Sequence, residues 1–184
     1  MPLCPLRSIS IYSFTKLPIY PLIMISIRTT TIEDVPLILD FIHRLAEYER
    51  AKPHEVAATE EDLKRDGFGT DPKFRCLIAE WNNVPAGFAL YFYNYSTWLS
   101  RPGLYLEDLF VLPERRGKGI GKALLRRLAQ IAVGENCYGM RWQVLDWNEP
   151  SIKFYESLGA TMLKEWETMR LMGPALATLA GEPE

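Results

Sequence analysis

The sequence predicts a single mixed α/β domain. Strand-like and helix-like segments alternate from Met24 onward with short connections, as they do in mixed α/β folds. The chain has 184 residues, of which 48% are hydrophobic, so it can bury one sizeable core but is too short for two comfortable domains. We expect this domain to cover residues 24–172, followed by a frayed C-terminal tail at residues 173–184.

The first half of the domain is expected to hold two helices and three strands. Thr31–Asp34 and Thr59–Asp62 have the form of capping boxes and mark helix starts. Asn82-Asn83 supplies the turn between two antiparallel strands. The expected elements are a strand at 25–28, a helix from 31 to about 49, a short helix from 59 that Gly67 and Gly69 stop, and strands at 75–81 and 86–95.

The second half is expected to continue the alternation. A strand at 104–112 ends at Pro113, and apolar residues at helical spacing from Ile120 to Ile131 indicate a helix that ends near Gly134. The remaining expected elements are a strand at 140–145, a short helix at 151–158 closed by Gly159, and a weak last strand from Thr161.

The composition excludes several classes of protein. A net charge of -2 indicates neither a nucleic acid nor an anionic membrane as partner. The three cysteines, Cys4, Cys76 and Cys137, are odd in number and widely spaced, which fits a reducing cytoplasm better than a disulfide framework. With two histidines and no ligand spacing in the sequence, no metal site is expected.

Residues 1–23 do not fit the domain pattern. Lys16 and several prolines interrupt their apolar residues, and no small-residue cleavage site follows. No run in the chain approaches the roughly 18 apolar residues of a membrane span. We expect residues 1–23 to be an extension outside the fold, with a degenerate targeting segment as the alternative.

The strongest chemical signal is the glycine-rich run from Arg115 to Lys122, between a predicted strand and a predicted helix. Glycine lets the backbone approach a ligand, and the first amides of a helix lack internal partners. Such a turn suits a phosphate or pyrophosphate at the positive end of the helix dipole. Basic side chains of this run would add charge around the anion; they are Arg115, Arg116, Lys118 and Lys122.

The spacing of the turn narrows the choice of ligand. A P-loop needs four residues between its glycine and the Gly-Lys pair, then Ser or Thr, whereas Ala123 follows Lys122 here. A dinucleotide fingerprint needs glycine at the position of Leu124. The plain alternative is a tight turn with a solvated basic helix face.

The turn and its flanking segments resemble one family. Arg116–Gly121 resembles the (Gln/Arg)-x-x-Gly-x-(Gly/Ala) element of the GNAT superfamily of N-acetyltransferases. Leu106–Leu112 and Asp146–Ala160 resemble its spermidine/spermine N-acetyltransferase branch, which includes thialysine-acetylating relatives. The resemblance runs from about Met24 to about Trp166 and implies a GNAT-like, mixed and mostly antiparallel central sheet flanked by helices.

The resemblance also implies a cofactor, an acceptor and their binding residues. It implies acetyl-CoA, a small cationic amine such as a polyamine, diamine or thialysine-like amino acid, and a homodimer whose last strand packs or exchanges across the two-fold axis. The implied cofactor residues are Leu109, Phe110, Val111, Arg116, Gly117, Lys118, Gly119, Ile120, Gly121, Lys122, Asn148, Pro150 and Ser151. The implied substrate residues are Tyr48, Glu49, Glu107, Arg141, Trp142, Gln143 and Glu167.

Acetyl transfer to an amine requires proton transfers. A lysine-like ammonium is neutral in roughly one molecule in a few thousand at pH 7, so a base is useful, and Glu107 is the candidate. In a regular strand Asp108 would point to the opposite face. The alternative is that Glu107 only attracts the cation. Tyr155 matches the family's general acid; alternatively, Phe154 and Tyr155 are an aromatic pair packed on the sheet.

Other functions stay open at this point. A covalent route through a cysteine is not expected. Cys76 lies inside a strand pattern and is interpreted as a small buried hydrophobic residue, and Cys137 follows the end of a helix with no histidine nearby in sequence. Acetylation of another amine, such as an antibiotic or a protein amino group, is one alternative. A non-catalytic acyl-CoA-binding module is another.

Overall fold

The computed structural model describes residues 24–181, so the extension expected at 1–23 lies outside the described residues. The chain divides into two compact units, one ending at Trp142 and one beginning at Gln143. Between residues 24 and 181 no helix combines the length and apolar character that a membrane crossing requires.

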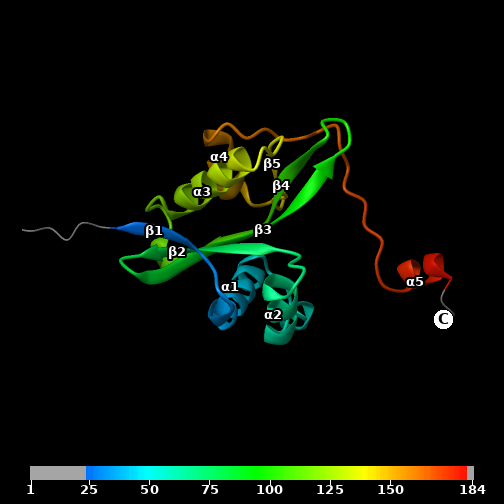
Figure 1. The fold of residues 1–184 in the computed structure, drawn as a ribbon, viewed down its shortest axis with the longest axis horizontal. Helices are drawn as coiled ribbons and strands as arrows, with labels where there is room; N and C mark the ends of the chain where they lie inside the picture. Colours follow the sequence, from blue (N-terminus) through cyan, green and yellow to red (C-terminus); the bar gives the residue numbers. More distant parts are fainter. Residues whose placement is uncertain (1–23, 182–184) are drawn as a thin grey trace, which may run out of the picture. The chain divides into compact units, whose positions relative to one another are not determined.

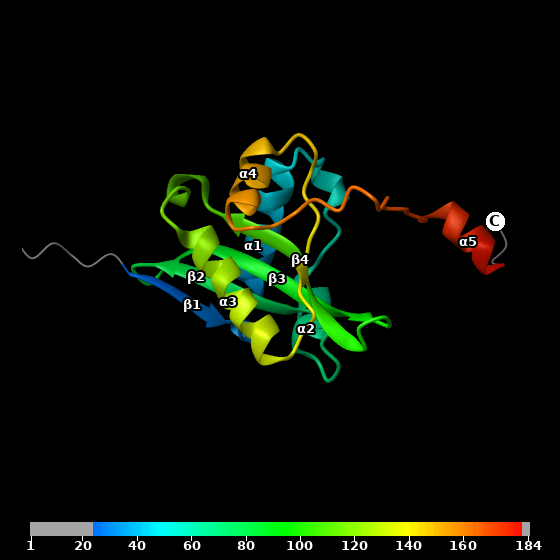
Figure 2. The same cartoon turned by 90° about the horizontal axis from the view of Figure 1, so that it is seen from above.

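The first unit is built on a five-stranded sheet with the order β1-β2-β3-β4-β5. The first four strands are antiparallel neighbours, and β5 runs parallel to β4. Figures 1 and 2 show β1 to β4 side by side in the sheet. The mixed, mostly antiparallel sheet predicted from the sequence is thus confirmed. The strands are β1 (Ile25–Thr29), β2 (Arg75–Trp81), β3 (Val84–Ser96), β4 (Arg101–Val111) and β5 (Met140–Arg141).

Helices cover both faces of this sheet (Figure 1). On one face, α1 (Val35–Tyr48) and α2 (Glu60–Phe68) enclose a core cluster that includes Phe41, Phe88 and Phe110. On the other, α3 (Ile120–Gly134) contacts strands β1 to β4. Both predicted helix starts are confirmed: a 3-10 turn, η1 (Ile32–Asp34), leads into α1, and the Thr59 hydroxyl accepts the Asp62 amide hydrogen at the start of α2.

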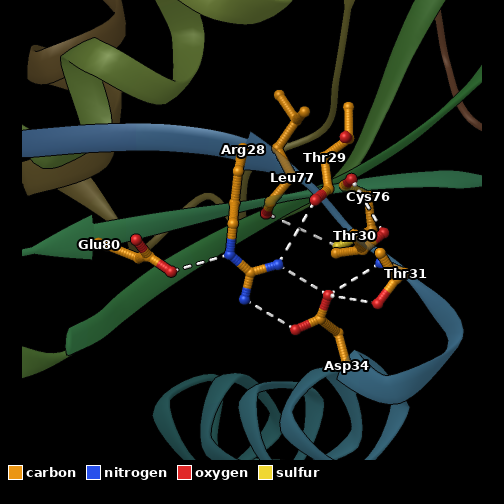
Figure 3. A network of polar contacts seen from close by, with 8 residues as sticks. All are labelled: Arg28, Thr29, Thr30, Thr31, Asp34, Cys76, Leu77 and Glu80. Atoms are coloured by element: carbon orange, nitrogen blue, oxygen red, sulfur yellow. Dashed lines mark hydrogen bonds and ion pairs between the residues drawn. The ribbon is translucent and has the colours of Figure 1, made fainter. Parts of the chain in front are cut away.

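A polar network fastens β1 to its neighbours (Figure 3). The Arg28 guanidinium makes a bidentate contact with Asp34 of η1, at 2.7 and 2.8 Å, and its Nε donates to Glu80 of β2 at 2.8 Å. The Thr30 hydroxyl donates to the Cys76 carbonyl at 3.1 Å. One side chain therefore joins β1, β2 and the start of α1.

The second unit differs from the sequence prediction. Its helix α4 (Glu149–Ser157) begins two residues before the expected start at Ser151. The last strand expected from Thr161 is wrong, because residues 160–172 contain neither helix nor strand. The tail expected to fray at 173–184 instead forms α5 (Pro174–Ala180), which has proline in its first turn and the left-handed Gly181 at its end, both standard helix signals.

The strand expected at 140–145 is also shorter than predicted. β5 pairs only Met140 with Leu104 and Arg141 with Tyr105. Beyond Leu106, β4 contains a register shift, and such a bulge bends a strand and interrupts its ladder. The parallel ladder therefore stops after two residues.

Candidate functional site

The glycine-rich turn connects the end of β4 to α3 as predicted. A short 3-10 turn, η3 (Pro113–Arg115), follows β4, and Gly117 and Gly119 then adopt positive φ angles of 72° and 86°. A residue with a side chain would be strained at either angle. Ala123 donates the first helical hydrogen bond, to the Gly119 carbonyl at 3.0 Å, so the amides of Ile120–Lys122 precede the internal bonding of α3.

Arg116 joins this turn to the end of α1. Its Nε donates to the Val111 carbonyl at 3.0 Å, and its guanidinium carbon lies 4.3 Å from the centroid of the Tyr48 ring and 5.7 Å from that of Phe110. The side chain is thus held by protein contacts at the turn. Cation–π contacts leave the positive charge in place.

Two more cations of the turn are engaged on a different aromatic ring. The Lys118 ammonium lies 5.3 Å and the Arg115 guanidinium carbon 6.0 Å from the centroid of Trp81, the last residue of β2. Lys118 also donates to the Glu114 carbonyl at 3.0 Å. Neither the motif nor its spacing pointed to Trp81.

The β-bulge in β4 overturns the expected alternation at Glu107 and Asp108. Leu90 of β3 pairs with Asp108, but Tyr91 pairs with Leu106, so Glu107 is the extra residue of the bulge. Asp108 shares the sheet face of its partner Leu90, which belongs to the α1 core cluster, and Glu107 is exposed. Leu106 shares a face with Tyr91. The simple two-residue period therefore fails where the candidate base lies.

Asp108 is a second candidate for the base, although only Glu107 was expected from the sequence to have this role. Its carboxyl is largely removed from water, and this desolvation, together with the charges of Glu107 and Glu49, raises its pKa from 3.8 to about 7. Desolvation also raises the pKa of Glu49, which ends α1 beside Tyr48. The first unit thus gathers three carboxylates, one of which titrates near neutral pH. Such a group can both attract an ammonium and accept its proton.

The strand segment Leu109–Val111 presents one side of its backbone beside the turn. β3 pairs with this segment on one side. On the other side β5 reaches only Leu104 and Tyr105, so no strand among residues 24–181 pairs with Leu109–Val111 there. This edge therefore leaves backbone groups of Leu109–Val111 without a strand partner on that side, where a ligand arm could bind.

Two further predicted substrate residues, Arg141 in β5 and Trp142 just after it, also belong to the first unit. Arg141 is exposed and its guanidinium carbon lies 5.4 Å from the Tyr138 ring centroid. It pairs in register with Tyr105, which precedes the bulge. Trp142 follows it and is half-buried.

The second unit carries the other predicted residues. Asn148 is buried, and its Oδ1 caps α4 by accepting the Ser151 amide hydrogen at 3.4 Å. Pro150 lies in the first turn of this helix. Tyr155 is half-buried in α4, with its ring centroid 5.4 Å from that of Phe154. Gln143 donates to the Thr168 hydroxyl at 3.0 Å, next to the exposed Glu167.

The described residues also bear on metal binding and on a covalent route through cysteine. Residues 24–181 contain no group of three or more His, Cys, Asp or Glu side chains arranged to hold a metal ion. Burial strongly raises the pKa of the Cys76 thiol, and desolvation also raises that of Cys137. Both shifts disfavour the thiolate that a covalent route would need.

Comparisons with known proteins show the family and the fold of the chain. Residues 40–160 match the sequence model of the Acetyltransferase (GNAT) family. A thialysine N-epsilon-acetyltransferase from Sus scrofa is 41% identical over 167 residues, covering 85% of this chain and 97% of that protein. The spermidine/spermine N(1)-acetyltransferase-like protein 1 from Homo sapiens is 39% identical, covering 85% of this chain and 24% of that protein. A solved integron cassette protein from the V. cholerae mobile metagenome has a TM-score of 0.71 and 29% identity, covering 85% of this chain and 97% of that chain.

Proposed function

Because the chain belongs to the GNAT family of acetyltransferases, we propose that it moves the acetyl group of acetyl-CoA to a primary amine of a small cationic acceptor. The family predicted from the turn and its flanking segments is confirmed. One observation carries the proposal. Arg116 spans from the glycine turn to the ring of Tyr48, next to Glu49, and so ties an anion-binding turn to a group of carboxylates.

The turn has the properties that a diphosphate requires. Gly117 and Gly119 hold positive φ angles, and the amides of Ile120–Lys122 precede the first helical hydrogen bond. These amides would bind the diphosphate of CoA at the positive end of α3. The edge of Leu109–Val111 would bind the pantetheine arm. Asn148, Pro150 and Ser151 are proposed as further residues that bind the cofactor.

The carboxylates of the first unit would prepare the amine for reaction. The exposed Glu107 attracts the ammonium, and Asp108, with a pKa of about 7, accepts its proton. An ordinary aspartate has a pKa of about 3.9, so the raised value brings the acceptor closer to a lysine-like amine and lowers the cost of transfer. Bound acetyl-CoA supplies a thioester that the neutral amine attacks.

Tyr155 would complete the proton balance. A tyrosine hydroxyl can donate a proton at neutral pH, and we assign it to protonate the departing sulfur. The second proton, which the nitrogen loses as the amide forms, then restores the Tyr155 hydroxyl, and Asp108 releases the first proton to water. The buried, unreactive Cys76 thiol supports direct transfer between two bound substrates over an acyl-cysteine route.

The acceptor is proposed to be a thialysine-like amino acid amine, with polyamines and diamines as the second class. The relatives named for thialysine are about 40% identical over most of their length, which favours that acceptor. Tyr48 and Glu49 would bind its cationic end together with Glu107. The other proposed contacts are Arg141, Trp142, Gln143 and Glu167.

Both units are proposed to work as one acetyltransferase domain over residues 24–172, within a homodimer in the cytoplasm. Large apolar side chains of the second unit are exposed, among them Trp166, Met169 and Met172, which supports a partner surface. Cys76 and Cys137 are free, which agrees with a reducing compartment.

A panel of amines tests the proposal. The full chain is mixed with acetyl-CoA and thialysine, lysine, ornithine, putrescine, spermidine, an aminoglycoside or a peptide amine, and release of the CoA thiol is followed. We expect the highest kcat/KM with thialysine. A highest value with an aminoglycoside or peptide amine would overturn the acceptor class. CoA binding without release of thiol for any amine would instead indicate a non-catalytic binding module.

A further inference from the structure

Trp81 stands outside the residues assigned so far, yet it contacts two cations of the glycine turn. It is the last residue of β2 and pairs with Ile25 of β1 and with Val84 of β3. Because paired residues share a face of the sheet, these three side chains lie together. A Cβ on Gly119 would lie 3.9 Å from the Ile25 side chain, which independently places the turn over this corner of the sheet.

The backbone holds Trp81 firmly at this corner. Asn82 and Asn83 have positive φ angles of 53° and 62°, as in the tight turns that close two-residue hairpins. Asn82 is fastened to Met24 twice: its amide donates to the Met24 carbonyl at 2.9 Å, and its Oδ1 accepts the Met24 amide hydrogen at 3.0 Å. The ring therefore projects from a rigid hairpin, whereas the turn that it contacts contains three glycines, two of them at positive φ angles.

The turn places like charges close together. Arg115, Arg116 and Lys118 follow one another within four residues, next to the positive end of the α3 dipole. Without a bound anion, these charges repel one another and favour conformations that point into water. The face of an indole ring carries negative electrostatic potential and attracts cations. Trp81 offsets the repulsion for Arg115 and Lys118, as Tyr48 and Phe110 do for Arg116 on the other side of the turn.

We propose that Trp81 is a positioning residue for the cofactor: its ring keeps Arg115 and Lys118 beside the glycine turn, where they meet the phosphates of CoA. This inference rests on the proposed use of the turn for CoA. Preplaced cations lower the ordering cost of binding a charged ligand. Trp81 acts through these side chains and does not itself need to touch the cofactor.

The test is calorimetric titration of the full chain with CoA. Trp81→Leu removes the aromatic face, and we expect the Kd for CoA to rise about fivefold, in line with the loss of exposed cation–π contacts. Trp81→Phe keeps an aromatic face and is expected to stay within about twofold of the wild type. Val84→Ala is the matched control, because it shortens the exposed cross-strand neighbour of Trp81 and leaves both cations on the ring.

A second pair of measurements separates positioning from a general loss of structure. Inhibition by pantetheine, which lacks phosphates, is expected to be unchanged in Trp81→Leu. The Arg115→Gln/Lys118→Met double variant is expected to weaken CoA binding about fivefold or more. Adding Trp81→Leu to this double variant should weaken CoA binding little further, because the ring then has no cation to hold. If Trp81→Leu does not fold, the double variant alone decides: unchanged CoA affinity would overturn the proposal.

The outcomes distinguish this inference from the proposed function. A wild-type chain that binds no CoA overturns the proposed function, whatever the variants do. A wild type that binds CoA, with Trp81→Leu binding it equally well, overturns only the role of Trp81. An equal loss for CoA and pantetheine also overturns it, because the effect would then be independent of the phosphates.

Discussion

Asp108 and Glu107 show how one extra residue in a strand changes the chemistry of a site. The bulge places Glu107 outside the ladder and Asp108 on the face of the α1 core cluster. Desolvation is the largest cause of the raised pKa of Asp108, followed by the charges of Glu107 and Glu49. Two adjacent carboxylates can therefore serve different tasks, one as an exposed attractor and one as a proton acceptor.

The pH dependence of activity tests this division. With the pKa of Asp108 at about 7, the base is charged above that pH and protonated below it, so kcat/KM is expected to fall as the pH drops through this region. Asp108→Asn should lower kcat/KM about 100-fold and remove this step. Glu107→Gln removes a negative charge that raises the pKa of Asp108, so its step should move to lower pH. An unchanged step in Asp108→Asn would show that another group is the base.

Tyr155 gives a second prediction at the scale of a residue. Tyr155→Phe removes only the hydroxyl, so we expect kcat to fall about 100-fold, the lower end of the usual range for a positioned acid. The Kd for CoA, measured by calorimetry, should stay within about twofold, because the ring of Phe retains the packing against Phe154. Wild-type kcat across the pH range in this variant would remove Tyr155 from the mechanism.

Features of the site could be predicted from the sequence where they depend only on residues that are close together in the chain. The turn from Arg116 to Gly121 follows from glycine positions and a helix start, and the structure forms both as expected. Asp108 and Trp81 could not be found in this way. The bulge depends on the register between β3 and β4, and the contacts of Trp81 depend on which strand end lies beneath the turn.

At the scale of elements, Arg28 connects β1, β2 and η1 through side chains that are only partly exposed. The exposed fraction is 38% for Arg28, 12% for Asp34 and 19% for Glu80. Removing the guanidinium would leave two largely buried carboxylates next to each other without their cation. Such a loss costs more than the loss of a surface ion pair.

Arg28→Leu is therefore expected to lower the free energy of unfolding by about 2 kcal/mol, measured by urea denaturation. The matched control is Arg44→Leu, which removes a similar contact to Asp40 between side chains that are 53% and 49% exposed. That variant should lose much less stability than Arg28→Leu, because water and salt screen an exposed ion pair. Equal losses in the two variants would mean that burial does not strengthen the Arg28 network.

Element boundaries were predictable where local signals are strong. β2 has the expected bounds, and both capping boxes open helices. The strand from Thr161 failed because strand pairing depends on a partner, and residues 160–172 form no ladder. The helix α5 was missed although Pro174 and Gly181 mark its ends, because the segment was interpreted as a tail by its position in the chain.

At the scale of the whole molecule, the second unit exposes several large apolar side chains. Trp166, Met169 and Met172 are 67%, 90% and 63% exposed, and Leu179 in α5 is 76% exposed. Several large apolar side chains exposed within one short segment indicate an interaction surface. A two-fold axis would let the same segment of two chains cover each other, since such an interface is self-complementary.

We therefore expect light scattering after size exclusion to give the wild-type protein the mass of two chains. The Trp166→Ser/Met169→Ser/Met172→Ser variant should have the mass of one chain. Each buried apolar side chain contributes about 1.5–3 kcal/mol, and a two-fold interface counts every substitution twice, so the triple variant should lose the dimer entirely. Val133→Ser is the control, because it removes an 81% exposed apolar side chain from α3 of the first unit and should leave the mass unchanged. A wild type with the mass of one chain at every protein concentration would refute the dimer, and the exposed segment would then need another partner.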